Sequence, residues 1–242
     1  MLKLQNISIS ADKKSIVKDV NFHIKAGELH LLLGKNGSGK SSLAMALAGH
    51  PNYTITAGNF WIQGNLATKM LPENKAKEGL FLSFQNPPEI EGLSVIQFIK
   101  TATNSLLKKQ NKKPLSAPDF FKKLQNFQVE LEIEQSLLSR SLNRNFSGGE
   151  KKKIEMLQML FLKPKIAILD EPDSGVDINT KRIISKTIQR MKKDEKTAFL
   201  IITHTFDFAK TLSADTVHVM QNGKIIKSGE IDLLEKIERT GF

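Results

Sequence analysis

The chain has 242 residues, of which 40% are hydrophobic and 25% are charged, a composition typical of a folded domain with a sizeable core. It contains no cysteine, which excludes disulfides and any metal or iron–sulfur site built from thiolates. No apolar run approaches the roughly 18 residues that cross a bilayer, and no signal-like stretch opens the sequence. We therefore expect no direct membrane insertion and a protein that acts where it is made.

The net charge of +11 raises the question of a nucleic-acid partner. Most of the positive charge comes from lysine, whereas proteins that read bases or grip phosphates with two hydrogen bonds favour arginine. We interpret the lysine pairs as solvated surface and expect no nucleic-acid partner.

Segments 2–10 and 17–25 alternate in hydrophobicity with a period of two, which predicts half-exposed antiparallel strands. Further on, short apolar runs alternate with helical patterns. The predicted strands are 29–33, 59–63, 80–84, 166–169, 199–203 and 217–220, and the predicted helices are 40–48, 150–162 and 180–192. This alternation predicts an α/β fold with a mostly parallel sheet and an antiparallel β subdomain. Asn222-Gly223 predicts a tight hairpin turn after 217–220.

Residues 91–145 differ from their surroundings, because they are poor in strand signals, rich in Lys, Gln, Asn and Leu, and broken by Pro114 and Pro118. We interpret this stretch as a helical lobe inserted into the α/β core. The prediction is a single domain, 1–242, with a catalytic core of 1–90 and 146–242 and a lobe of 91–145.

A glycine-rich loop joins the strand 29–33 to the helix 40–48, and its sequence matches the phosphate-binding pattern G-x-x-x-x-G-K-[ST]. Its glycines let backbone N–H groups point at phosphates, and the start of the helix adds the positive end of its dipole. Lys40 is expected to neutralise β/γ-phosphate oxygens, and the Ser41 hydroxyl to bind Mg²⁺. The predicted nucleotide-binding residues of this loop are Gly34, Asn36, Gly37, Ser38, Gly39, Lys40, Ser41 and Ser42.

Two carboxylates follow the apolar run 166–169, and a buried strand would deliver both to the edge where open α/β sheets bind ligands. Asp170 suits a partner of Mg²⁺, directly or through water. Glu171 suits the group that polarises an attacking water. With the loop upstream, these residues predict a nucleotide hydrolase.

Further motifs follow in a fixed order along the chain: Gln85 at the end of a strand, the segment Phe146-Ser147-Gly148-Gly149-Glu150 before a helix, the segment Ser174-Gly175-Val176-Asp177, and His204 at the end of a strand. Together with the phosphate loop and the acidic strand end, they resemble the motifs of the ABC ATPases over essentially the whole chain. The resemblance implies a P-loop NTPase core and ATP and Mg²⁺ as cofactors. It implies that Gln85 binds the nucleotide and senses the metal, and that His204 acts at the γ-phosphate.

The resemblance therefore implies catalytic roles for Lys40, Glu171 and His204, and metal-binding roles for Ser41, Gln85 and Asp170. In this family the segment that begins at Ser147 contacts the γ-phosphate held by another subunit. Ser147 and Gly149 would then complete a partner's site, and ATP binding would bring two copies into a transient homodimer.

Within the family, segments 84–92, 146–159 and 169–178 are similar to the SufC-type ATPases, which commonly carry Leu where this chain has Val176. This resemblance implies the scaffold proteins SufB and SufD as partners in iron–sulfur cluster assembly. It also implies a location in the cytoplasm, or in the stroma or matrix of an organelle of bacterial descent.

Three other functions use the same residues. An ABC transporter would dock the same ATPase on a membrane protein, a translation-type protein would need a second ATPase domain, and a regulatory binder would not need Glu171.

The expected aromatic residue for stacking on adenine is absent from 9–13, so Ile16 or Val17 is expected to pack on the base instead.

Overall fold

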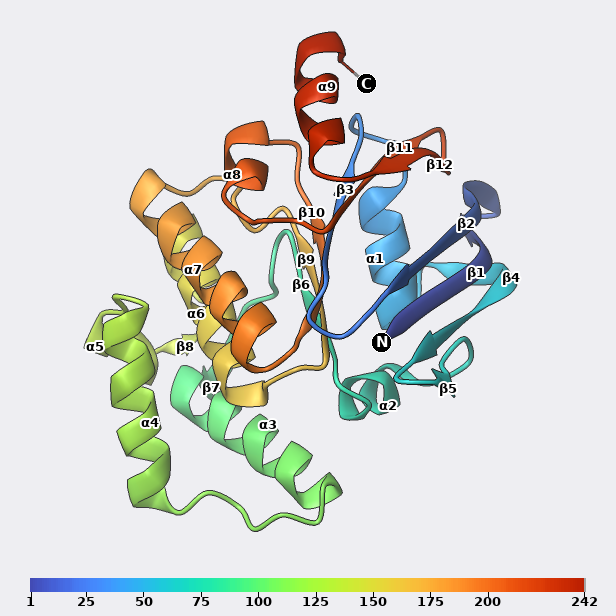
Figure 1. Ribbon diagram of the computed structural model, residues 1–242. Helices are drawn as coiled ribbons and strands as arrows, with labels where there is room; N and C mark the ends of the chain where they lie inside the picture. The colour runs from blue at the N-terminus through green and yellow to red at the C-terminus, as the bar shows by residue number, and fades with distance from the viewer. Residues whose placement is uncertain (242) are drawn as a thin grey trace. The chain divides into compact units, whose positions relative to one another are not determined.

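Figure 1 shows the computed structural model, which describes residues 1–241. The chain divides into two compact units, one of residues 1–85, 164–173 and 188–242, and one of residues 86–163 and 174–187. We call them the sheet unit and the helical unit. The predicted boundaries between the catalytic core and the helical lobe, at residues 90 and 146, stay a prediction.

The sheet unit contains a six-stranded sheet in the order β12-β11-β3-β10-β9-β6 (Figure 1). The strands are β3 (Leu29–Leu33), β6 (Leu80–Ser83), β9 (Ile166–Asp170), β10 (Ala198–Ile202), β11 (Thr216–Gln221) and β12 (Lys224–Gly229). All neighbours pair in parallel except β11 and β12, which form the predicted hairpin. Every residue of β3, β9 and β10 is buried, as expected for parallel strands covered on both faces.

A second, antiparallel sheet has the order β2-β1-β4-β5 and comprises β1 (Leu2–Ala11), β2 (Lys14–Ile24), β4 (Thr54–Ile62) and β5 (Asn65–Leu66). Helix α1 (Lys40–Ala48) lies between the two sheets (Figure 1), and its Leu43 and Leu47 are fully buried in a core shared with both. The unit also contains α2 (Pro72–Lys77), α8 (Phe206–Lys210) and α9 (Asp232–Thr240). The predicted α/β fold with a mostly parallel sheet and an antiparallel subdomain is confirmed.

The helical unit consists of α3 (Val95–Lys109), α4 (Ala117–Glu130), α5 (Gln135–Ser139), α6 (Gly148–Leu162) and a short sheet of β7 (Ile90–Ser94) and β8 (Ser141–Leu142). Helix α7 (Ile178–Asp194) begins in this unit and ends in the sheet unit. Pro118 lies in the first turn of α4, where its missing N–H costs nothing, so this proline starts a helix and does not break one. Pro114 lies in the loop before it.

The β11–β12 hairpin is tied to the loop that precedes α1. The Gly223 N–H donates to the Ser38 carbonyl at 2.9 Å, and the Lys18 N–H donates to the Gly223 carbonyl at 2.8 Å. Gly223 has a φ of 80°, and a Cβ there would lie 2.1 Å from the carbonyl oxygen of Ile16. The hairpin turn is therefore a bridge between β2 and the glycine-rich loop, and the bridge has room only for glycine.

We predict that Gly223→Ala lowers the free energy of unfolding by about 3 kcal/mol or more, because it adds a backbone clash to an unfavourable φ. Gly64→Ala is the matched control, since Gly64 has a φ of 91° and its Cβ would meet nothing within 4 Å. The control loses only about 1 kcal/mol, the cost of the left-handed conformation. Urea denaturation of both variants measures the difference, and equal losses would contradict the bridging role of Gly223.

Candidate nucleotide site

The glycine-rich loop closes around the side chain of Lys40, the first residue of α1. The Lys40 ammonium donates to the carbonyl oxygens of Gly34 at 2.7 Å and Lys35 at 3.0 Å. Only 5% of Lys40 is exposed, and burial lowers its pKa against the opposing effect of the Glu171 and Asp170 charges. The loop thus holds a buried cation on neutral carbonyls, an arrangement that an anion in the loop would improve.

Gly34, Gly37 and Gly39 all have positive φ angles, which lets the loop curl tightly before α1. A Cβ at Gly34 would lie 2.1 Å from the Met220 carbonyl oxygen, whereas a Cβ at Gly37 would meet nothing within 4 Å. One side of the loop therefore packs on β11, and the other side is open. Of the remaining predicted loop residues, Asn36 is exposed, Ser38 is buried, and Ser41 and Ser42 are half-buried.

Ser41 and Asp170 face each other at the edge of the parallel sheet. The Ser41 hydroxyl donates to a carboxylate oxygen of Asp170 at 3.2 Å, and Asp170 is fully buried at the end of β9. Within residues 1–241 no three His, Cys, Asp or Glu side chains are grouped to hold a metal ion. The Ser41–Asp170 pair nevertheless fits Mg²⁺, because this ion usually binds one or two carboxylates together with phosphates and waters.

Glu171 lies between two of the other predicted side chains. One carboxylate oxygen accepts a hydrogen bond from the Gln85 amide at 2.8 Å, and the other is 3.2 Å from Nδ1 of His204. The structure thus brings Gln85 to Glu171 and not to the Ser41–Asp170 pair with which it was grouped as a metal ligand. The φ of Glu171 is 49°, an uncommon value for a residue with a side chain, and its N–H donates to the Ile202 carbonyl at 2.9 Å. This backbone bond to β10 fixes the unusual turn that points Glu171 at its partners.

Asp173 and Thr203 support this arrangement, although no motif drew attention to them as positioning residues. The Thr203 hydroxyl donates to Asp173 at 2.9 Å and accepts from the Thr205 N–H at 3.1 Å, and both Asp173 and Thr203 are almost fully buried. The contact joins the segment after β9 to the segment after β10. It thereby positions His204 relative to Glu171. The sequence offers no signal for this pair, because Asp and Thr are residue types that are mostly exposed.

Ser147 and Gly149 belong to the helical unit, at the start of α6. The Ser147 hydroxyl accepts from the Glu150 N–H at 3.2 Å, and Glu150 accepts from the Ser147 N–H at 2.6 Å, which forms a capping box. A Cβ at Gly148 would lie 3.0 Å from the Gly175 carbonyl oxygen. The start of α6 therefore packs closely on segment 174–177, and the hydroxyl of Ser147 caps its own helix.

Segment 174–177 is itself held by a cap at the start of α7. Asp177 accepts from the N–H and the hydroxyl of Thr180 at 2.9 and 2.8 Å, and the hydrogen bond from the Thr180 backbone is the main cause of a lowered pKa of Asp177. A Cβ on Gly149 would come within 3.4 Å of the Thr180 hydroxyl. Two predicted motifs far apart in the sequence thus form one small cluster.

Ile16 and Val17, the residues expected to pack on the base, precede the loop on β2. Val17 is fully buried, and its side chain would touch a Cβ placed on Gly39, so it supports the loop from inside. Ile16 is half-buried. Of the two, only Ile16 offers an apolar surface to a ligand.

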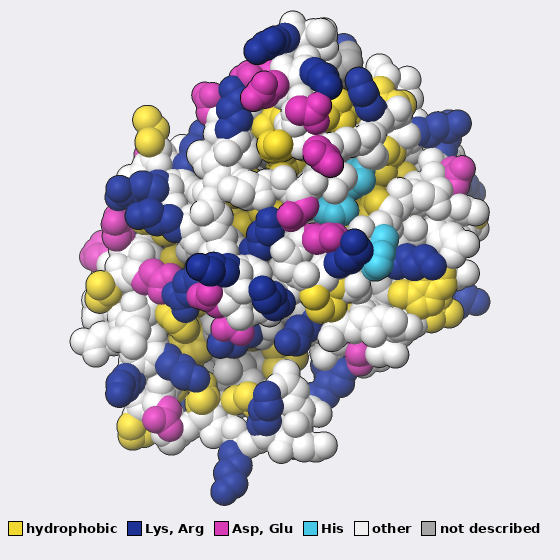
Figure 2. Space-filling view, in the orientation of Figure 1, with side chains coloured by type: hydrophobic (Ala, Val, Ile, Leu, Met, Phe, Trp, Pro, Cys, Tyr) yellow, Lys and Arg dark blue, Asp and Glu magenta, His cyan; other side chains and the backbone are white. Residues whose placement is uncertain are grey.

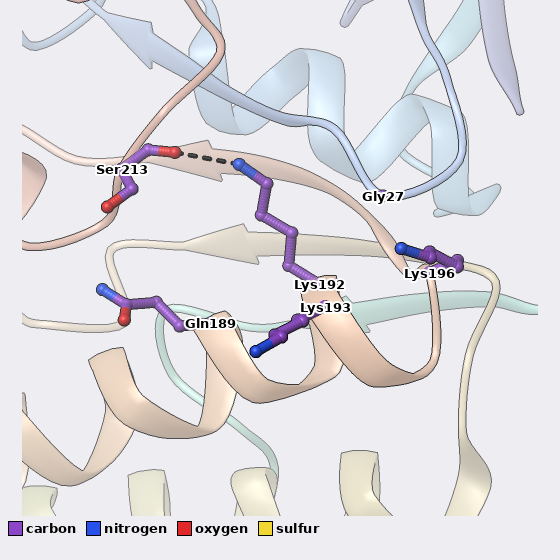
Figure 3. A pocket seen from close by; sticks show the side chains of 6 residues that line it. All are labelled: Gly27, Gln189, Lys192, Lys193, Lys196 and Ser213. Atoms are coloured by element: carbon purple, nitrogen blue, oxygen red, sulfur yellow. Dashed lines mark hydrogen bonds between the residues drawn. The ribbon is translucent and has the colours of Figure 1, made fainter.

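A separate recess of about 380 Å³ lies at the end of α7 (Figure 3), lined by Gly27, Gln189, Lys192, Lys193, Lys196 and Ser213. The Lys192 ammonium donates to the Ser213 carbonyl at 2.9 Å and pairs with Asp215 at 2.7 Å. The carboxyl end of a helix is the negative end of its dipole. This end attracts the lysines and disfavours the binding of an anion there. On the face shown in Figure 2, basic and acidic side chains are interspersed and form no single basic stripe. We therefore take the phosphate loop, and not this recess, as the candidate nucleotide site.

Comparison with known proteins identifies the family. The model of the ABC transporter family matches residues 17–174. The "Probable ATP-dependent transporter ycf16" of Antithamnion sp. is 40% identical over 100% of this chain and 96% of its own length. The "Probable ATP-dependent transporter slr0075" of Synechocystis is 41% identical over 100% and 94%. "Vegetative protein 296" of Bacillus subtilis is 38% identical over 100% and 91%.

The solved dimer of the ATP-binding cassette MJ0796, in a post-hydrolysis state bound to ADP and Pi, matches with a TM-score of 0.82. It covers 96% of this chain and 99% of that one at 19% identity, a likeness that supports the fold alone. The chain belongs to the ABC transporter family and is an ATPase of that family, as the order of its motifs predicts. Among residues 1–241, no helix combines the length and apolar character needed to span a membrane.

We predict that Lys40→Ala weakens ATP binding by about 10- to 100-fold, because it removes the charged hydrogen-bond donor from the loop. Lys35→Ala is the matched control, since Lys35 is an exposed lysine of the same loop whose backbone carbonyl, not its side chain, contacts Lys40. Its ATP affinity should stay within about threefold of the natural chain, the change expected from losing one exposed charge. Isothermal titration calorimetry measures both, and equal losses would show that Lys40 has no special role.

Proposed function

We propose that this chain is the ATPase subunit of a SufB–SufD scaffold for iron–sulfur cluster assembly, and that ATP-dependent pairing of two copies changes the shape of that scaffold. The observation that carries the proposal is the similarity of segment 84–92 to the SufC-type ATPases, beside a complete set of hydrolytic residues in the sheet unit. The absence of cysteine assigns the cluster itself to the partners. The proposed location is the cytoplasm or an organelle compartment of bacterial descent.

Binding of ATP begins at the phosphate loop. The Lys40 ammonium exchanges its hydrogen bonds to carbonyl oxygens for charged ones to the β- and γ-phosphates. Ser41 and Asp170 would hold Mg²⁺, which when bound supplies positive charge to the phosphate oxygens. The open side of the loop at Gly37 leaves room for this approach.

Hydrolysis is assigned to Glu171 and its two partners. The reaction adds water across the bond between the γ-phosphorus and its bridging oxygen and gives ADP and phosphate. Both carboxylate oxygens of Glu171 are engaged, one by Gln85 and one by His204. Each carboxylate oxygen has two lone pairs, so Glu171 can also accept a hydrogen bond from a water and orient it. A bound γ-phosphate would offer both Gln85 and His204 an anionic alternative partner.

The second copy would supply Ser147 and Gly149. The start of α6 presents the N–H groups of a capped helix, a favourable partner for phosphate oxygens. Closure of two copies over ATP would exclude water other than the attacking one, and loss of the γ-phosphate would weaken the pair. The change in the shape of the scaffold is thus driven by the difference in the free energy of pairing between the ATP-bound and the ADP-bound copies.

An ABC transporter subunit is the second candidate, favoured by the word "transporter" in the names of two full-length relatives. The two functions predict different partners for the same surface. Ile90 lies within segment 84–92 and is 38% exposed, so an apolar contact with either partner would include it.

We predict that purified SufB–SufD forms a stable complex with the chain and raises its ATPase rate by about tenfold or more, because the scaffold holds two copies close together. Ile90→Asp should weaken the complex by about tenfold or more through loss of an apolar contact. Val129→Asp is the control, since Val129 is a 75% exposed apolar residue of the same unit. Size-exclusion chromatography measures the formation of the complex, and phosphate release measures the ATPase rate.

A chain that forms no complex with SufB–SufD, and whose slow ATPase rate is unchanged by them, contradicts the Suf assignment. Co-purification with an integral membrane protein would then establish the transporter function. Neither outcome contradicts the assignment of the chain as an ATPase.

A further inference from the structure

The helical unit contains a small pocket that the nucleotide chemistry does not use. Its volume is about 170 Å³, and its walls come from α3, α4, α6 and the loop between α3 and α4. Most of the lining is apolar, including Leu115, Phe127 and Phe161. A cavity of about 150 Å³ with such a lining is large enough to hold a benzene ring. The pocket therefore has the size and character of a site for a small apolar group.

The walls of the pocket are firmly positioned. The ring of Phe161 packs on Phe120 with centroids 5.1 Å apart and on Phe127 with centroids 5.3 Å apart. The loop that carries Leu115 is fixed to α3, because the Leu115 N–H donates to the Asn104 side chain at 3.1 Å. A pocket with such supports is preformed, which reduces the entropy cost of binding.

Two kinds of polar group interrupt the apolar lining. Thr103 of α3 is only 4% exposed, and within residues 1–241 its hydroxyl has no hydrogen-bond partner. A buried hydroxyl without a partner costs free energy that a ligand oxygen can recover. Lys123 is an exposed lysine that also lines the pocket, so positive charge lies at its solvent side. No acidic side chain is among the described lining residues.

We propose that this pocket binds a small monocarboxylate whose apolar body is about the size of a benzene ring. The apolar body packs between the leucines and phenylalanines, and the carboxylate is neutralised by Lys123. Thr103 supplies a hydrogen-bond donor to a ligand oxygen. The site is independent of the phosphate loop, so its occupant is a second ligand and not the nucleotide.

The test is an NMR titration of the full chain with benzoate, and with benzylamine and benzyl alcohol as probes that keep the ring and change the charge. We expect saturable shifts at the pocket residues with benzoate, and about tenfold weaker binding of benzylamine, because the Lys123 charge attracts a carboxylate and repels an ammonium. Equal binding of the three probes, shifts outside the pocket, or no saturation with benzoate would overturn the proposal.

Variants locate the site and separate the charge from the shape. Lys123→Met should weaken benzoate binding by about threefold or more, the usual effect of one partly exposed charge pair. Lys122→Met, the neighbouring lysine that does not line the pocket, should leave benzoate affinity unchanged. Leu115→Trp fills the pocket and should abolish benzoate binding, while Thr103→Val should weaken it by about threefold or more. Unchanged benzoate affinity in Lys123→Met, Leu115→Trp and Thr103→Val would overturn the proposal.

Discussion

The buried ammonium of Lys40 is the constraint on which the site depends. Lys40 must be inside the loop to reach phosphates, yet a buried cation is costly unless it is hydrogen-bonded. The carbonyls of Gly34 and Lys35 meet this need, and they can do so only because the loop curls tightly. That curl requires glycine at Gly34 and a hairpin turn at Gly223 that supports Ser38. The curl of the loop and the hairpin that supports it thus serve to hold one buried charge.

Those parts of the site that lie within one segment of the chain were predictable from the sequence. Gly34 to Ser42, Asp170 and Glu171 follow directly from local patterns, because a phosphate loop and a strand that ends in acids are built from neighbours in sequence. The parallel sheet follows from apolar runs such as 29–33 and 166–169, which the structure buries completely. Local pattern is sufficient wherever one strand and the turn after it determine the chemistry.

Contacts between distant segments were not predictable in this way. Three features depend on strands that are adjacent only in the folded sheet. They are the Asp173–Thr203 bond, the positive φ of Glu171 and the support of the loop by Met220. The placement of Gln85 beside Glu171 is another such case, because the sequence grouped it with the metal ligands. Likewise the pocket around Thr103 arises from three helices, and the pattern of no single one of them indicates a pocket.

In the proposed function, two halves of one reaction belong to different parts of the chain: the sheet unit would hold ATP, and the start of α6 would complete the site of a second copy. Sedimentation velocity of Glu171→Gln with ATP and Mg²⁺ tests this most directly, because the variant binds ATP but does not orient water. We expect a stable ATP-bound dimer that is absent with ADP and absent when Lys40→Ala is added. A variant that binds ATP and remains a monomer at every concentration would contradict it.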